Sequence, residues 1–152
     1  MGNQLVIAHR GNTAGVNPRH ENMPDYILEA LNQGFDAECD LWKIGEELFL
    51  GHDKPQYKVE WDFLIKRPLW VHCKNIEAAH YAVKYKQFHT FCHQKDDFAL
   101  TSGGYLWTYP GKPLTDKSIA VLPETVPDWD ISIAYGICTD YPIRYKTEMK
   151  KQ

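Results

Sequence analysis

Short apolar segments, separated by Gly, Pro and polar residues, recur along the whole chain. They are four to seven residues long and are bounded by turn-forming residues, a pattern typical of β-strands. We therefore predict about eight strands, which cover residues 5–9, 35–41, 69–74, 90–94, 98–101, 106–109, 119–123 and 137–140.

Two helices are predicted between the early strands. The first begins at Pro24, which suits the first position of a helix, and ends before Gly34, which favours a left-handed stop. The second begins after Asn75, a good N-cap residue, and ends near residues 84–86. Apolar residues lie on one face of each helix, namely Ile27, Leu28 and Leu31 in the first and Ile76, Ala79, Ala82 and Val83 in the second.

Strand, helix and strand alternate in the first half, which indicates a parallel sheet covered by helices. The order of elements does not decide whether this sheet is open or closed into a barrel. After about residue 95 the strands follow one another closely, with Gly and Pro between them. The second half is therefore predicted to be poor in helices.

Length and composition place residues 1–152 in one domain, because 152 residues that are 43% hydrophobic can bury one sizeable core. No segment reaches the ~18 consecutive apolar residues of a membrane span, and no basic segment followed by an apolar one opens the chain. We therefore expect a soluble, cytoplasmic protein. The net charge of −3 disfavours a nucleic-acid partner.

The four cysteines lie in apolar, strand-like segments and show no paired spacing. Free cysteine is among the most buried residue types. We therefore expect reduced, buried thiols at Cys39, Cys73, Cys92 and Cys138.

Two acidic residues share one face of the predicted strand 35–41. Strand alternation places Glu38 and Asp40 together, with apolar neighbours on the other face. Two adjacent carboxylates repel each other unless a cation or strong donors hold them, so the pair suggests hard oxygen ligands for Mg²⁺ or Ca²⁺. A solvent-facing polar stripe on an edge strand is the alternative.

Other polar side chains follow the ends of neighbouring strands. His72 and Lys74 share a face of the strand 69–74, and in a parallel α/β domain such strand ends meet where ligands bind. His9 ends the first strand and His52 follows the segment 48–51, and two histidines suit acid–base chemistry near neutral pH. Arg10 could hold a phosphate oxygen in a bidentate contact.

These residues, in this order and at this spacing, resemble the glycerophosphodiester phosphodiesterase family. The resemblance covers most of the chain, strongly up to Lys74 and weakly between about residues 95 and 135. Its motifs are His9-Arg10-Gly11, Glu21-Asn22, Glu38-x-Asp40, His52-Asp53, Val71-His72-Cys73-Lys74 and Gly136-Ile137-Cys138-Thr139-Asp140-Tyr141-Pro142.

The resemblance implies a (β/α)8 barrel with a metal-dependent phosphodiesterase site. His9 and His52 would be the catalytic acid–base pair, and Glu38 and Asp40 would bind a divalent metal. Arg10 and Lys74 would hold the phosphate, with Glu21 beside them. The substrate would be a small phosphodiester, which is cleaved to an alcohol and a phosphomonoester.

Two departures from the family pattern change the details. His72 stands where the family usually has a third carboxylate ligand, and an imidazole favours Mn²⁺ or Zn²⁺ over Ca²⁺. The chain is also short, because a (β/α)8 barrel typically needs ~250 residues. We therefore expect a compact TIM-type barrel whose outer helices are reduced in its second half. Strand surface left bare by missing helices could be covered in a homo-oligomer.

Two other functions remain open. Sphingomyelinase D-like toxins resemble the same family and form a cyclic phosphate by internal attack. A catalytically silent phosphate-binding domain would keep the pocket without turnover, although such a domain has no need of the His9 and His52 pair. Trp42, next to the acidic pair, and His93, at a strand end, are further candidates for substrate contacts.

Overall fold

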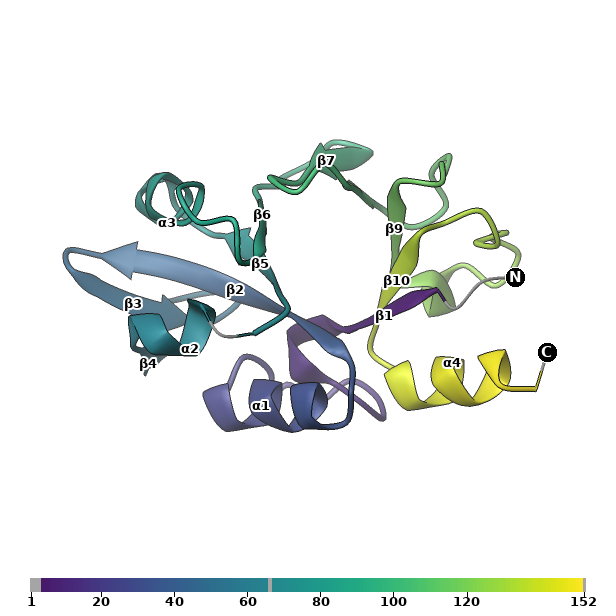
Figure 1. Ribbon diagram of the computed structural model, residues 1–152, viewed down its shortest axis with the longest axis horizontal. Helices are drawn as coiled ribbons and strands as arrows, with labels where there is room; N and C mark the ends of the chain where they lie inside the picture. The colour runs from purple at the N-terminus through teal and green to yellow at the C-terminus, as the bar shows by residue number, and fades with distance from the viewer. Residues whose placement is uncertain (1–3, 66, 152) are drawn as a thin grey trace.

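The computed structural model describes residues 4–65 and 67–151, which form an α/β fold around one strongly curled sheet (Figure 1). The strands are β1 (Leu5–Ala8), β2 (Asp36–Ile44), β3 (Glu47–Leu50), β4 (Tyr57–Val59), β5 (Leu69–Cys73), β6 (His89–Phe91), β7 (Phe98–Leu100), β8 (Leu106–Thr108), β9 (Ser118–Val121) and β10 (Gly136–Thr139). The α-helices are α1 (Pro24–Asn32), α2 (Trp61–Ile65), α3 (Ile76–Ala82) and α4 (Pro142–Met149), and two 3₁₀ turns are η1 (His9–Gly11) and η2 (Pro123–Thr125).

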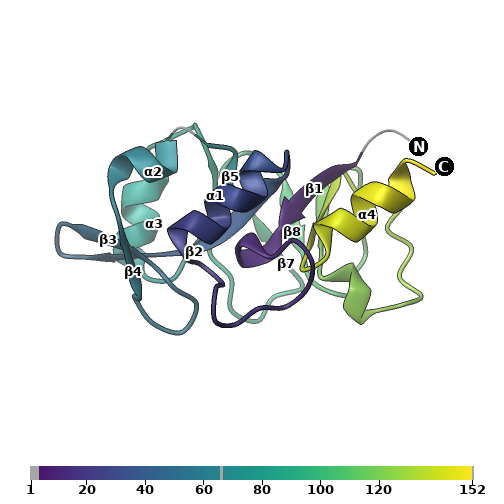
Figure 2. The ribbon, with the colours of Figure 1, turned by 90° about the horizontal axis from the view of Figure 1, so that it is seen from below.

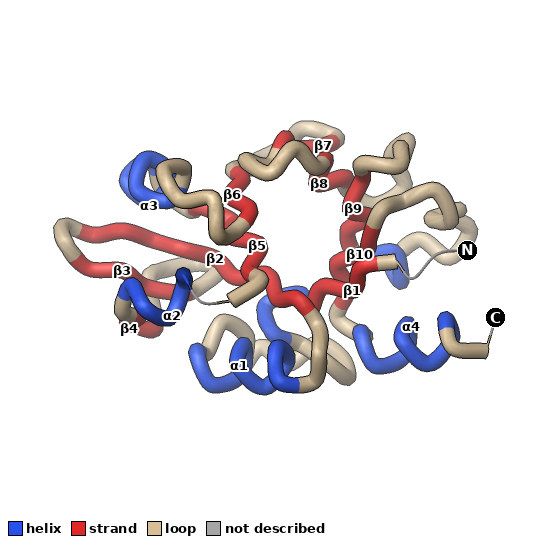
Figure 3. Tube along the Cα trace, in the orientation of Figure 1, coloured by secondary structure: helices blue, strands red, loops and turns tan. Residues whose placement is uncertain are grey.

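Eight strands follow one another around an incomplete ring, called the ring below, in the order β6-β5-β2-β1-β10-β9-β8-β7 (Figure 3). Neighbours in this order are parallel except β7 and β8, which form an antiparallel hairpin. The far half of β2 leaves the ring and pairs antiparallel with β3, which pairs with β4. This hairpin projects beside α2 and α3 (Figure 1).

The ring has no strand ladder between its two ends, β6 and β7, in the described ranges. A backbone hydrogen bond of 2.8 Å from the Ser102 N–H to the Thr90 carbonyl bridges this gap. A complete (β/α)8 barrel is therefore not shown, and the α-helices in the described ranges are few. After β6, α4 is the one α-helix among the described residues, which agrees with the predicted helix-poor second half.

Hydrophobic side chains form two layers on the two faces of the curled sheet. Inside the ring, Trp70, Phe91 and Trp107 are nearly fully buried, and Phe91 stacks on Trp107 with 4.4 Å between ring centroids. The second layer lies between the sheet and the helices. Figure 2 shows α1 and α4 side by side with β1, outside the sheet.

Local sequence explains where the predicted helices begin and end. Pro24 occupies the first turn of α1, and Gly34 follows the helix with a φ of 86°. The Asn75 side chain accepts the Ala78 N–H at the start of α3 and also hydrogen-bonds both backbone groups of Lys43. Asn75 thus ties α3 to the projecting part of β2.

All eight predicted strands are present with bounds shifted by at most a few residues, and α1 and α3 lie where helices were predicted. The predicted apolar face of α3 is wrong in part, because Ile76 and Val83 are 77% and 61% exposed. The sequence pattern does not predict β3, β4, α2 or α4. The first three are only three to five residues long, and α4 carries few apolar positions. Three of the four free cysteines are buried as expected, but that expectation is wrong for Cys92, which is exposed. In the described ranges, no helix has both the length and the apolar character needed to cross a membrane.

Candidate active site

A cavity of about 490 Å³ lies at the carboxyl ends of the ring strands. This is the end of a parallel α/β sheet at which ligands usually bind, because the loops there combine side chains from several strands. Eight of the ten residues singled out from the sequence line it, namely His9, Arg10, Glu38, Asp40, His52, His72, Lys74 and His93. The remaining two, Glu21 and Trp42, are not among the lining residues.

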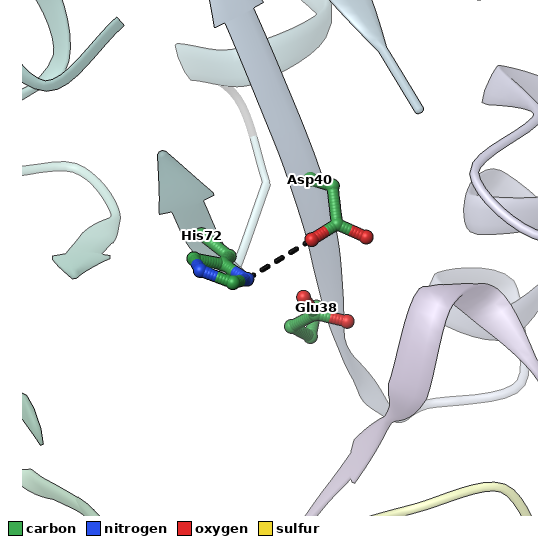
Figure 4. Close-up of side chains that lie close together, drawn as sticks. All are labelled: Glu38, Asp40 and His72. Atoms are coloured by element: carbon green, nitrogen blue, oxygen red, sulfur yellow. Dashed lines mark ion pairs between the residues drawn. The ribbon is translucent and has the colours of Figure 1, made fainter. Parts of the chain in front are cut away.

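Strands β2 and β5 bring the three predicted metal ligands together. The parallel register places Asp40 directly opposite His72, and Glu38 lies two residues earlier on the same face of β2. One ligand atom from each residue lies within 4.8 Å of the other two. Figure 4 shows the three side chains converging from the two strands, with the contact between His72 and Asp40 marked.

Asp40 is the most heavily contacted member of this group and is only 1% exposed. Its backbone N–H donates to Asn22, and the Asn22 amide donates back to Oδ2 at 2.9 Å. Nδ1 of His72 lies 3.0 Å from Oδ1, and Nδ1 of His52 lies 3.4 Å from Oδ2. Burial would raise the pKa of Asp40, but the contacts with His52, His72 and Asn22 outweigh it and hold the pKa well below its usual range.

Glu38 has the opposite electrostatic balance. It is 3% exposed, and burial together with the neighbouring Asp40 charge raises its pKa, despite the positive influence of His9, His72 and Arg10. Its Oε2 accepts a hydrogen bond of 3.0 Å from the Arg10 backbone N–H. A cation between the two carboxylates would relieve the repulsion that raises the Glu38 pKa.

The turn after β1 places His9 and Arg10 at the cavity. Arg10 and Gly11 both have a positive φ, 52° and 84°, and a Cβ at Gly11 would come 3.1 Å from Ile27 and Tyr26 side-chain atoms of α1. Glycine is therefore required at this tight approach. The turn points the Arg10 guanidinium back into the cavity, where it lies 3.2 Å from Glu21 Oε2 and 3.2 Å from His52 Nε2.

His9 is held by Asp140, the residue that follows β10. Its Nδ1 lies 2.8 Å from Oδ1 of Asp140, and Asn12 donates to the same oxygen at 2.8 Å. This leaves Nε2 on the side of Glu38, 4.0 Å from Oε2. Burial lowers the pKa of His9, but the hydrogen bond to Asp140 and the Glu38 charge outweigh it, so the pKa lies above its ordinary value.

Among the described residues, three buried polar atoms at Asp40 make no contact with hydrogen-bond geometry, namely Arg10 Nε, Asp40 Oδ1, although His72 Nδ1 is 3.0 Å away, and His52 Nδ1, which lies 3.4 Å from Asp40 Oδ2. Arg10 Nε lies 3.6 Å from Asp40 Oδ2, close enough for attraction but without hydrogen-bond geometry. Native proteins leave few buried polar groups unsatisfied, and a catalytic role, a bound water or a bound ion is among the usual reasons for one. All three atoms belong to or lie beside Asp40, one of the candidate metal ligands.

The remaining predicted residues take supporting places. The Lys74 ammonium lies 4.0 Å from Asp40 Oδ1, and the His93 ring stacks on Tyr109 with 3.5 Å between centroids at the cavity wall. Glu21 binds Arg10 from outside the cavity. The Trp42 Nε1 donates to the Gly51 carbonyl at 2.7 Å, so this side chain braces the segment that carries His52.

Asn12, Asn22 and Asp140 have no role predicted from the sequence, although Asn22 and Asp140 belong to the motifs that carry the family resemblance. Asn12 is fully buried and joins Asp140 to Glu21, with its Oδ1 accepting from the Tyr26 hydroxyl. Asn22 has a φ of 66°, an uncommon backbone state for a residue other than glycine. The three side chains fix His9, Arg10 and Asp40.

Comparison with models of known families, with curated proteins and with solved structures finds no match for this chain. The family resemblance of the motifs therefore stays a prediction. The case for a function rests on the cavity and on the residues that line it.

Proposed function

We propose that this protein is a metal-dependent phosphodiester hydrolase of the glycerophosphodiester phosphodiesterase type. One observation carries the proposal. Two carboxylates of β2, four histidines, an arginine and a lysine converge on one cavity, and three buried polar atoms there are unsatisfied among the described residues. A solvated polar stripe, the alternative for Glu38 and Asp40, does not account for side chains that are 3% and 1% exposed.

The proposed fold is a compact variant of the (β/α)8 barrel. The eight-strand order around the ring and the site at the carboxyl strand ends support this assignment. In this view, α1, α3 and α4 are retained outer helices, and the links around β7 to β9 are reduced to turns. The β7–β8 hairpin takes the place of two parallel strands.

Glu38, Asp40 and His72 have the donor set and the separations to hold a divalent metal. Two carboxylates with one imidazole suit Mg²⁺ or Ca²⁺, and the imidazole extends the choice to Mn²⁺ and Zn²⁺. The unsatisfied Asp40 Oδ1 fits this role. A bound metal would polarise the phosphoryl oxygens and stabilise charge that develops in the transition state.

Arg10 and Lys74 would bind the phosphate oxygens. The Arg10 guanidinium is anchored by Glu21 at 3.2 Å and still faces His52 and the cavity. The planar guanidinium matches two oxygens at once, whereas the Lys74 ammonium acts as a point charge. Together they would orient the phosphorus between the two histidines.

The two histidines would move protons on opposite sides of the phosphorus. His9 carries a raised pKa and presents Nε2 toward the cavity, so it would protonate the leaving alcohol. His52 lies between Asp40 and Arg10 and would accept the proton of the attacking water or substrate hydroxyl. Attack by water gives an alcohol and a phosphomonoester, and internal attack gives a cyclic phosphate.

The test is hydrolysis of bis(p-nitrophenyl) phosphate and glycerophosphocholine by the purified protein, with EDTA and then with Mg²⁺, Ca²⁺, Mn²⁺ or Zn²⁺ added. The proposal expects metal-dependent turnover that His9→Ala and Glu38→Ala abolish. His80→Ala, which removes an exposed histidine of α3, is the matched control and should keep full activity. Phosphate binding without turnover under every condition would support the silent binding domain instead.

The homo-oligomer and the cytoplasmic location stay predictions. On the outer face of β7, Phe98 and Leu100 are 54% and 68% exposed, which is the kind of surface a second copy could cover. Sedimentation velocity that shows a monomer at every concentration would contradict the oligomer.

A further inference from the structure

A second cavity lies at the other end of the ring, where the strands begin. It is a groove of about 660 Å³ between the start of β1, the turn before β2, the segment before β10 and the last turns of α4. Its walls include Leu5, Phe35, Ala134, Lys146, Met149 and Lys150. The volume is within the range of about 300–1,000 Å³ that is usual for small-molecule sites.

The groove exists because no helix fills the space beside α4. The described residues 126–135, which connect η2 to β10, contain no helix, whereas a strand–helix–strand unit would place one there. The apolar side chains of Leu5 and Met149 are consequently only partly buried. The groove is separate from the proposed active site and shares no lining residue with it.

The charge at the groove is of one sign. Lys146 and Lys150 are one helical turn apart on α4 and its C-terminal cap, and the groove-lining residues within 4–65 and 67–151 include no Asp or Glu. Among the described lining residues, this is a local excess of positive charge in a chain with a net charge of −3. The Lys146 ammonium lies across the groove wall, 4.9 Å from the centroid of the Phe35 ring and 3.3 Å from the Gln33 carbonyl.

We propose that this groove binds a free fatty-acid carboxylate, with the alkyl chain on the apolar floor and the carboxylate between Lys146 and Lys150. An apolar floor with two cationic groups at one rim matches a ligand that has an apolar body and one anionic end. Ammonium-to-carboxylate hydrogen bonds are the stronger, charge-assisted kind. The site does not depend on the proposed hydrolase function.

Titration of the ¹⁵N-labelled protein with sodium decanoate, decanol or decyltrimethylammonium, each below its micelle concentration, tests the site by amide NMR shifts. Decanoate should shift the amides of Gly34, Phe35, Ala134 and Met149 saturably. Hexanoate should bind more weakly than decanoate, by up to about fourfold for each methylene that is buried. Equal affinity for decanol, or shifts that map elsewhere, would overturn the proposal.

Charge reversal tests the two lysines separately. Lys146→Glu and Lys150→Glu should each weaken decanoate binding by about tenfold or more, because a charged hydrogen bond is lost and a repulsion is gained. Lys151→Glu makes the same change in net charge at an exposed neighbour outside the groove and should leave binding unchanged. Equal weakening of decanoate binding in all three variants would overturn the proposal. Occupation of the groove by a second copy of the chain would also overturn it. The amide spectrum of each variant also reports whether it is folded.

Discussion

His9 and Asp140 meet across the ends of the adjacent parallel strands β1 and β10, with 2.8 Å between Nδ1 and Oδ1. The strand register pairs the preceding residues, Ala8 and Thr139, so the contact continues the alignment of the ladder. Glu124 accepts hydrogen bonds from the Asp140 N–H and the Thr139 hydroxyl. These bonds hold the backbone that carries the Asp140 carboxylate. The proposed acid is therefore positioned by the residue that follows β10, the strand next to its own in the sheet.

Asp140→Asn should lower the pKa of His9, because it removes the negative charge and replaces a charged acceptor with a weaker, neutral one, and both raise this pKa above 6.5. Protonated His9 stabilises the folded state fully at pH values below its pKa in the unfolded chain. This stabilisation is lost as the pH rises through the pKa of His9 in the folded protein. The pKa of Asp140 is lowered by the same contact, so the variant should lose most stability between about pH 4 and about pH 6.5, where Asp140 is ionised and His9 is protonated. Its high-pH limb of activity should also move to lower pH.

Histidine proton NMR across the pH range measures this pKa directly. Asp53→Asn is the control, because Asp53 is 94% exposed and contacts His52 instead. An unchanged His9 pKa in Asp140→Asn would show that the contact does not govern the proton on His9.

Metal binding should stabilise the folded protein through Glu38, Asp40 and His72. At a free Mn²⁺ concentration 100 times its Kd, the free energy of unfolding should rise by about 2.7 kcal/mol. Asp40→Asn should abolish this increase, and Glu77→Gln, on the exposed side of α3, should not. Thermal unfolding with and without the metal is the measurement, and stabilisation that survives in Asp40→Asn would place the metal elsewhere.

His72→Glu should change which metal is preferred. A third carboxylate replaces the imidazole, so the preference should move from Mn²⁺ and Zn²⁺ toward Mg²⁺ and Ca²⁺. Calorimetric titration of both proteins with the four metals gives the order of affinity. The same order in both proteins would argue that His72 is not a ligand.

Arg10→Lys should lower kcat/KM by about tenfold to a hundredfold, because the ammonium cannot make the planar, two-point contact with phosphate. Arg144→Lys on the exposed face of α4 is the matched control. Steady-state kinetics on bis(p-nitrophenyl) phosphate distinguish the two. Unaltered kinetics in Arg10→Lys would remove Arg10 from the phosphate site.

Side chains buried inside the ring should contribute much more to stability than exposed side chains on its outer face. Phe91 is 3% exposed between His72 and Trp107, so Phe91→Ala should cost about 3–5 kcal/mol. Phe98 is 54% exposed on the outer face of β7, and Phe98→Ala should cost less than about 1 kcal/mol. Denaturant unfolding measures both, and equal losses would mean that the interior layer is not packed as described.

Local pattern was enough to predict the strands that carry the candidate metal ligands, since alternation puts Glu38 and Asp40 on one face of β2 and His72 on one face of β5. Local pattern could not predict contacts between residues that lie far apart in the sequence. Asp140 reaches His9 across 131 positions, and no local signal reports such a contact. Trp42 was expected at the pocket because it follows Asp40, but β2 leaves the ring there and its indole turns to Gly51.

The most direct test of the proposed function is ³¹P NMR of glycerophosphocholine incubated with the protein and each divalent metal in turn. The account predicts a phosphomonoester resonance that requires a metal and is lost in His9→Ala but kept in His80→Ala. A cyclic phosphate in its place would assign the attack to a substrate hydroxyl. An unchanged diester spectrum with all four metals would contradict the hydrolase.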